Sequence, residues 1–157
     1  MLRPLAIAST LLVAVLAAGC GGDDATKEDF RRDVLAARND TDAGLAQIVQ
    51  ATSVEDLLAR MRVAASEVRG AATDVREADA PEELEDERGA LAARLLALSD
   101  EIVKTVETLE LFPDQAAITS ALNFEQWNAV QAELAKLGKL GVKVPPLGRH
   151  QPKPEPQ

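Results

Sequence analysis

Few residues in this 157-residue chain could carry out chemistry, and the most distinctive is its only cysteine, Cys20. One cysteine cannot form an internal disulfide, and alone it is too few ligands for a zinc site. The only histidine, His150, lies in a proline-rich stretch. A serine nucleophile needs a histidine held beside it in a folded pocket, so the serines after Cys20 predict no catalytic site: Ser53, Ser66, Ser99 and Ser120. We therefore predict that the protein is not an enzyme.

Carboxylates are plentiful, and two runs of them resemble parts of metal sites. The run Asp40-Thr41-Asp42-Ala43-Gly44 is similar to the opening of a calcium loop, but it has glycine at the third ligand position and no later glutamate at the twelfth. The second run falls at a predicted helix start, where carboxylates favour the positive end of the helix dipole: Glu82, Glu83, Glu85, Asp86 and Glu87. The sequence thus predicts no bound metal and no cofactor.

The residues before Cys20 have the order of a secretion signal. Arg3 is the only charge, and residues 5–18 form an apolar run interrupted only by Ser9 and Thr10. A helix of that length spans roughly 21 Å at about 1.5 Å per residue, whereas a bilayer core is about 30 Å thick. The run therefore suits a cleaved signal better than a permanent transmembrane helix.

The end of this run, Ala17-Ala18-Gly19-Cys20, resembles the lipobox of bacterial lipoproteins. The resemblance implies that a diacylglyceryl group is attached to the sulfur of Cys20 and that the signal is cut between Gly19 and Cys20. It also implies that the protein is held at the outer face of the cell membrane. Ala17 departs from the Leu, Val or Ile usual at its position. An ordinary signal cut near Ala17 and an uncleaved anchor remain the alternatives.

The chain after Gly19 has 138 residues, enough for one domain with a core. It keeps all 26 acidic residues and 16 of the 17 basic ones, a formal charge of −10. Such a surface repels nucleic acid and anionic headgroups, so neither is an expected partner. Aromatic residues are scarce while alanine and leucine dominate, a composition typical of packed helices.

Hydrophobic periodicity predicts an all-α fold, an antiparallel up-down helical bundle of three long helices and a shorter fourth. The predicted parts are a signal peptide over 1–19, the lipidated Cys20 with a flexible spacer over 20–26, the bundle over 27–140 and a tail over 141–157. The tail is rich in proline and is expected to bury nothing apolar, which predicts an extended or disordered segment.

Capping patterns locate the helix starts. Thr26 with Asp29 and Ser53 with Asp56 predict the first two, and Pro81 opens the third, which ends at residues 112–113. Weak helix formers over 39–44 leave open a kink in the first helix. A short piece over 115–122 precedes the last helix, for which Asn123 with Gln126 is the predicted cap. In that helix Trp127 keeps step with Val130, Leu134 and Leu137, so it is expected to point inward.

The order of these elements is similar to small helical lipoproteins of high-GC Gram-positive bacteria. The shared features are the lipobox, a short Gly/Asp spacer, Val-Glu-Asp-Leu-Leu at 54–58, Ala-Pro-Glu-Glu-Leu at 80–84 and a leucine-rich third helix. Many such proteins add a cysteine pair near the two ends of the bundle, which this chain lacks. The resemblance implies location and fold, because that family is largely without assigned function.

Two classes of function follow. The first is a lipid-anchored, extracytoplasmic, non-catalytic binding, scaffold or accessory module with an unknown protein partner. The alternative is a helical bundle that binds a small ligand in a cavity between its helices. A filled core would favour the first class, and a gap in the core the second.

Overall fold

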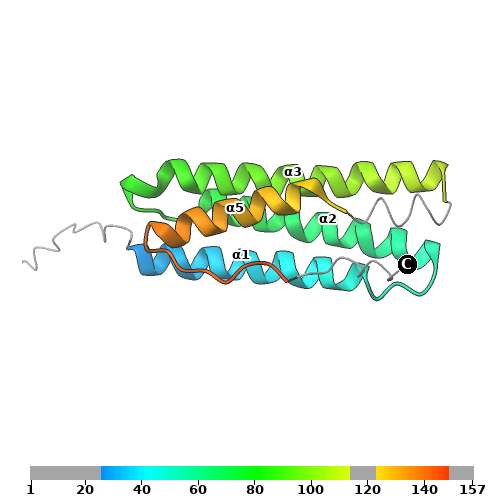
Figure 1. Cartoon of the computed structure of the whole chain (residues 1–157), viewed down its shortest axis with the longest axis horizontal. Helices are drawn as coiled ribbons and strands as arrows, with labels where there is room; N and C mark the ends of the chain where they lie inside the picture. Colours follow the sequence, from blue (N-terminus) through cyan, green and yellow to red (C-terminus); the bar gives the residue numbers. More distant parts are fainter. Residues whose placement is uncertain (1–25, 114–122, 149–157) are drawn as a thin grey trace, which may run out of the picture.

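The computed structural model describes residues 26–113 and 123–148, and over these ranges the chain is helical without β-strands. The elements are α1 (Lys27–Ile48), α2 (Val54–Glu77), the short 3₁₀ helix η1 (Glu82–Leu84), α3 (Glu85–Leu111) and α5 (Glu125–Lys139). They form an antiparallel up-down bundle of three long helices and a shorter one, as predicted (Figure 1). Within the described ranges, no helix combines the length and apolar character needed to cross a membrane.

Two of the three predicted caps are confirmed. The hydroxyl oxygen of Thr26 accepts a hydrogen bond from the backbone N–H of Asp29, and that of Ser53 accepts one from Asp56, each at 3.1 Å. Residues 39–44 lie inside α1, which continues through them without a break. Packing against α2 compensates there for weak intrinsic helix propensity.

The cap predicted for the last helix is wrong. Phe124 is the N-cap residue of α5 and makes no side-chain cap. Instead, the carboxylate of Glu101 on α3 accepts hydrogen bonds from the backbone N–H groups of Glu125 and Gln126, at 2.8 and 2.9 Å. A neighbouring helix thus supplies the negative charge that the positive end of α5 favours, and sequence spacing gave no signal for it. The predicted piece over 115–122 lies outside the described residues.

Each helix packs on the next in chain order: α1 on α2, α2 on α3 and α3 on α5. Helix α1 approaches α2 closely at Gly44, where an added Cβ would lie 3.4 Å from the Cα of Ala64. Among the described residues, the backbones of α1 and α5 do not approach each other as closely as those of helices that are neighbours in the chain, which leaves a wider space between these two helices.

The core is continuous along the bundle and is made of Leu, Ile, Val and Ala, with Phe30 and Met61 fully buried in it. Among the residues that the structure describes, two buried polar ones interrupt it, Thr41 and Ser99. The Ser99 hydroxyl donates a hydrogen bond to the carbonyl of Ala65 at 2.8 Å, which joins α3 to α2. Trp127 is only partly buried against this core, so its predicted inward orientation is correct in direction but not in extent.

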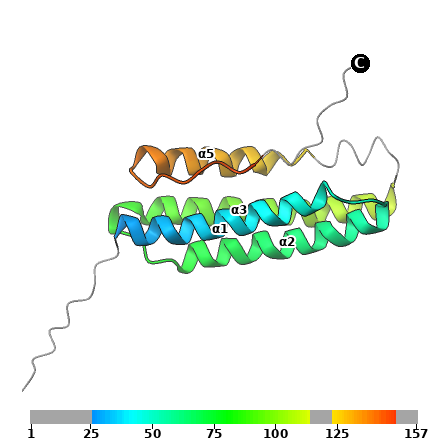
Figure 2. The same ribbon diagram turned by 90° about the horizontal axis from the view of Figure 1, so that it is seen from below.

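Residues 141–148, which we call the strap, are extended, which is one of the two predicted conformations, but the prediction that this stretch buries nothing apolar is wrong. Gly141 turns the chain in a left-handed conformation (φ 98°) that favours glycine. From there the strap runs extended in the space between α1 and α5 (Figures 1 and 2). Val142 is 0 % exposed and Leu147 3 % exposed. These apolar residues of the tail are buried because the space between α1 and α5 accommodates them. Residues 149–157 lie outside the described ranges.

Candidate functional site

Of the residues that the sequence singled out for chemistry, those that the structure describes are not brought together. Gly19, Cys20, Ser120 and His150 lie outside the described ranges. Ser53 caps α2, and Ser66 is exposed. Ser99 is buried with its hydroxyl bonded to Ala65, so it faces no pocket.

The acidic run over 82–87 lies at the start of η1 and α3 and is met by basic residues of neighbouring elements. Lys27 of α1 lies 3.4 Å from Glu83, and Lys136 of α5 lies 3.3 Å from Glu87. The backbone N–H of Glu83 itself, and then Lys27, lower the pKa of the Glu83 carboxyl. Within the described ranges, no group of three acidic, histidine or cysteine side chains is placed to hold a metal ion.

Between the described parts of the helices, the central space leaves almost no room for a ligand. The central space enclosed by apolar side chains and the stem of Arg38 is about 10 Å³, roughly the volume that one water needs. Two larger hollows are open to solvent. One, of about 220 Å³, lies on the α1–α2 face beside Asp40, Glu67 and Asp74.

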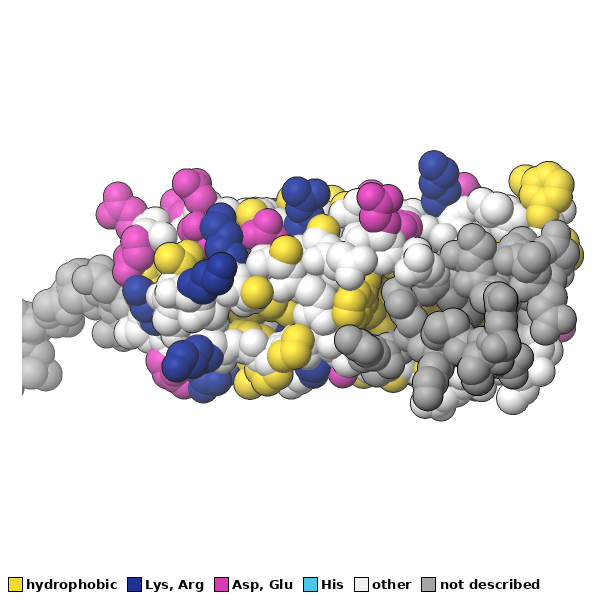
Figure 3. Space-filling view, in the orientation of Figure 1, with side chains coloured by type: hydrophobic (Ala, Val, Ile, Leu, Met, Phe, Trp, Pro, Cys, Tyr) yellow, Lys and Arg dark blue, Asp and Glu magenta, His cyan; other side chains and the backbone are white. Residues whose placement is uncertain are grey.

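The other hollow, of about 790 Å³, lies at the end of the bundle where α2 begins and α3 ends. Leu58 and Pro113 line it, and the neighbouring Leu111 and Phe112 are exposed to 73 and 62 %. This end is opposite to Lys27, where α1 begins (Figure 1). On the face seen in Figure 3, Asp and Glu side chains gather at the Lys27 end.

The most elaborate arrangement of polar groups surrounds the strap. From α5, the amide of Gln131 pairs with both backbone groups of Leu147: its Nε2 donates to the Leu147 carbonyl at 2.9 Å, and its Oε1 accepts from the Leu147 N–H at 3.0 Å. A side-chain amide that matches the donor and acceptor of one residue fixes that residue in an extended conformation.

From α1, Arg38 and Asp42 hold the other edge of the strap. The Arg38 guanidinium donates to the carbonyl of Pro146 through Nε at 3.1 Å and also through Nη2. The Asp42 carboxylate accepts from the Gly148 N–H at 2.6 Å, and it pairs with Arg38 at 3.3 Å. Both charged side chains are largely buried, which strengthens these bonds relative to bonds in water.

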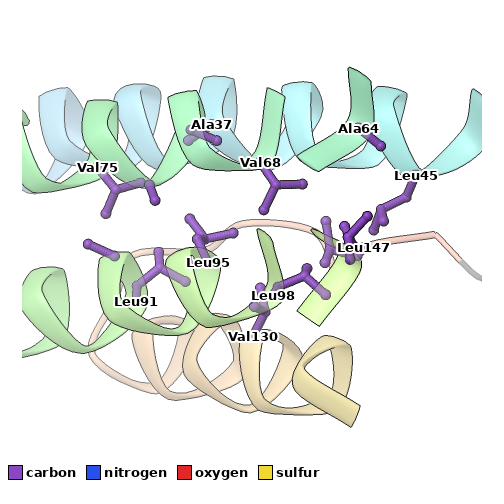
Figure 4. Close-up of a cluster of buried hydrophobic side chains, with 14 of the residues drawn as sticks. Ala37, Leu45, Ala64, Val68, Val75, Leu91, Leu95, Leu98, Val130 and Leu147 are labelled. Carbon is purple, nitrogen blue, oxygen red and sulfur yellow. The ribbon is translucent and has the colours of Figure 1, made fainter. Parts of the chain in front are cut away.

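These contacts define the strap groove. Its walls are Val34, Ala37 and Arg38 of α1 with Val130, Gln131 and Leu134 of α5, and its floor is Val75, Leu91 and Leu95. Leu147 enters the buried apolar cluster that includes Leu95, Leu98 and Val130 (Figure 4). At the start of the strap, Lys27 donates to the carbonyl of Leu140 at 3.4 Å. The polar side chains of the groove therefore form hydrogen bonds with the strap's backbone. At the end of the groove, one large side chain of the strap, Leu147, is buried.

The sequence analysis missed this site because its polar residues, Arg38, Asp42 and Gln131, look like ordinary surface positions on amphipathic helices. A usable signal was Val142, Val144 and Leu147 among the prolines, since an apolar residue at each of these positions is unusual for a solvated tail. Comparisons with protein-family models, with curated proteins and with solved structures find no match for this chain.

Proposed function

We propose that this protein is an exported, lipid-anchored, non-catalytic docking module at the outer face of the cell membrane. The anchor is the diacylglyceryl group on Cys20, and the order of charged residue, apolar run and Ala17-Ala18-Gly19-Cys20 supports it. Two acyl chains hold a protein at a membrane where one chain binds only reversibly. Since α1 begins at Lys27, six residues separate the lipid from the bundle.

The observation that favours docking over the alternative, a ligand carrier, is the filled core of the described part of the bundle. A site for a small molecule commonly has a volume of about 300–1,000 Å³ and buries most of the ligand, whereas the central space here is about 10 Å³. The exposed Leu111 and Phe112 lie at the end opposite to Lys27. A lipid on Cys20 therefore presents them away from the membrane, where a protein partner can reach them.

The anchor is tested by Cys20→Ser in cells that make the full chain. The variant has no thiol for the lipid, so we expect loss of lipid labelling and loss of the lipoprotein-specific cut. Gly21→Ser is the matched control, because it changes the neighbouring spacer residue and should leave processing intact. A Cys20→Ser protein that is still cut and still held at the membrane would refute the anchor.

The choice between docking and ligand carriage is tested by native mass spectrometry of the protein extracted from membranes. We expect the mass of the chain from Cys20 onward plus its lipid, with no further bound small molecule. A stoichiometric extra mass, lost on denaturation, would instead establish the ligand carrier.

A further inference from the structure

The strap groove has the properties of a peptide-binding site. Its polar side chains bond to backbone groups of the strap: Arg38 to Pro146, Gln131 to Leu147 and Asp42 to Gly148. Modules that bind extended peptides work in this way, because backbone bonds supply affinity for any sequence and a side-chain pocket supplies the selection. Here the pocket is the one that Leu147 fills.

The walls of the groove are independent of its occupant. Among the described residues, α1 packs on α2 and α5 packs on α3, whereas the backbones of α1 and α5 do not approach each other closely. Removing a segment from the groove therefore leaves the packing of α1 on α2 and of α5 on α3 in place. A strap that closed an otherwise complete bundle could leave and return as a local event, without unfolding of the helices.

The strap's own sequence shows what the groove accepts. Pro145 and Pro146 have no N–H and restrict the backbone to extended conformations before binding, which lowers the entropy lost on ordering. The Pro146 carbonyl then meets Arg38, and Leu147 offers the N–H, carbonyl and apolar side chain that the site needs. The Gly148 N–H meets Asp42.

Building on the docking role above, on which this rests, we propose that the strap groove is an exchangeable binding site for an extended, proline-containing protein segment. The strap is its resident occupant, and a partner's segment with an apolar residue, two prolines, leucine and a small residue replaces it. The strap is joined directly to α5, so it competes at a high effective concentration, on the order of millimolar or above for a short connection. The partner consequently binds in competition with the strap.

The test uses the full chain in detergent micelles and a fluorescent peptide with the sequence of residues 141–148. Leu147→Asp introduces a charge at the buried anchor and should release the resident strap while Arg38, Asp42 and Gln131 remain. We expect saturable peptide binding to Leu147→Asp, measured by anisotropy, and at least about tenfold weaker apparent binding to the wild-type chain. Adding Gln131→Ala to Leu147→Asp should weaken binding by about tenfold, and a peptide with Asp in place of its leucine should not bind.

Two outcomes of this titration would overturn the proposal. One is absence of saturable binding to Leu147→Asp when its helical circular dichroism matches the wild type. The other is binding that Gln131→Ala leaves unchanged, since the peptide would then lie elsewhere. Concentration-dependent dimers of the wild-type chain, lost in Leu147→Asp, would show that the occupant is a second copy's strap rather than a partner's segment, which also contradicts the proposal.

Hydrogen exchange of the wild-type chain provides a readout that does not depend on the variant folding. The Leu147 and Gly148 amides should exchange at least about a hundredfold faster than the α2 core amides around Val68, through local opening of the strap. Equal protection at both places would mean that the strap leaves only on global unfolding, and the groove could then not exchange its occupant. Neither readout depends on Cys20, so failure here is distinguishable from failure of the lipid anchor.

Discussion

Helix α1 is held on two sides by different means. Toward α2 the contact is direct, with Gly44 against Ala64 and a continuous set of buried apolar side chains. Toward α5 the contact passes through the strap, where Arg38 and Asp42 on one side and Gln131 on the other bond to a third segment. The first interface depends on the close fit of apolar side chains. The second depends on hydrogen bonds to the backbone N–H and carbonyl groups of the strap. The first should therefore respond to added volume, and the second to loss of its anchor and polar groups.

The largest effect should come from Gly44→Leu. An added Cβ at this position would meet Glu67 Oε2 at 2.5 Å and the Ala64 Cα at 3.4 Å, so a full leucine side chain must push α1 away from α2. We expect a loss of about 3 kcal/mol in the free energy of unfolding, measured by urea denaturation. Gly70→Ala is the matched control because nothing lies within 4 Å of its added Cβ. It should stabilise α2 by about 0.5–1 kcal/mol, and effects of the same sign would contradict the close approach.

A smaller effect is expected for Leu147→Ala, which removes the strap's buried anchor but leaves the helices in contact. The loss should be about 2 kcal/mol, at the low end for a buried leucine, because the strap can detach locally. Pro145→Ala is the control, since Pro145 is exposed, and it should cost less than about 1 kcal/mol. If the two variants are equal in denaturation, Leu147 does not anchor the strap.

Next in size is Glu101→Gln, which keeps the shape of the side chain but removes the charge that caps α5. We expect a loss of about 1 kcal/mol, because a charge-assisted cap is replaced by a neutral one. Trp127, the only tryptophan, lies in the first turns of α5, so its fluorescence reports this change directly. Glu107→Gln on the exposed face of α3 is the control and should leave the emission unchanged.

The smallest expected effect is the dependence of stability on pH that comes from Asp56, near the start of α2. The Thr52 backbone N–H, followed by Arg60, lowers the pKa of Asp56 below its ordinary 3.8. A carboxyl with a lowered folded-state pKa stabilises the fold fully above its ordinary value and loses that contribution as pH falls through the folded-state pKa. Urea denaturation should therefore show a decline in stability below about pH 4. Asp56→Asn should reduce the decline; an unchanged pH profile would show that this cap does not contribute.

The sequence was sufficient for the parts of the fold that local chemistry controls. The Thr26 and Ser53 caps are made by residues three apart, and the stripe through Leu57, Met61 and Val68 follows from helix geometry alone. Trp127 was placed on the correct side of α5, but how deeply it is buried depends on how much of α3 a short helix covers.

What the sequence alone determined, then, is the set of helices, their apolar faces and the up-down order that short connections impose. Tertiary structure alone decided that α5 stays apart from α1, that Glu101 caps α5 from 24 residues away and that the proline-rich segment becomes a strap. The physical reason is range: caps and stripes depend on neighbours within two turns, whereas Arg38 meets Pro146 across 108 residues. Polar residues on a helix surface hold another segment only when the fold brings that segment beside them, and the local sequence pattern around these residues does not predict it.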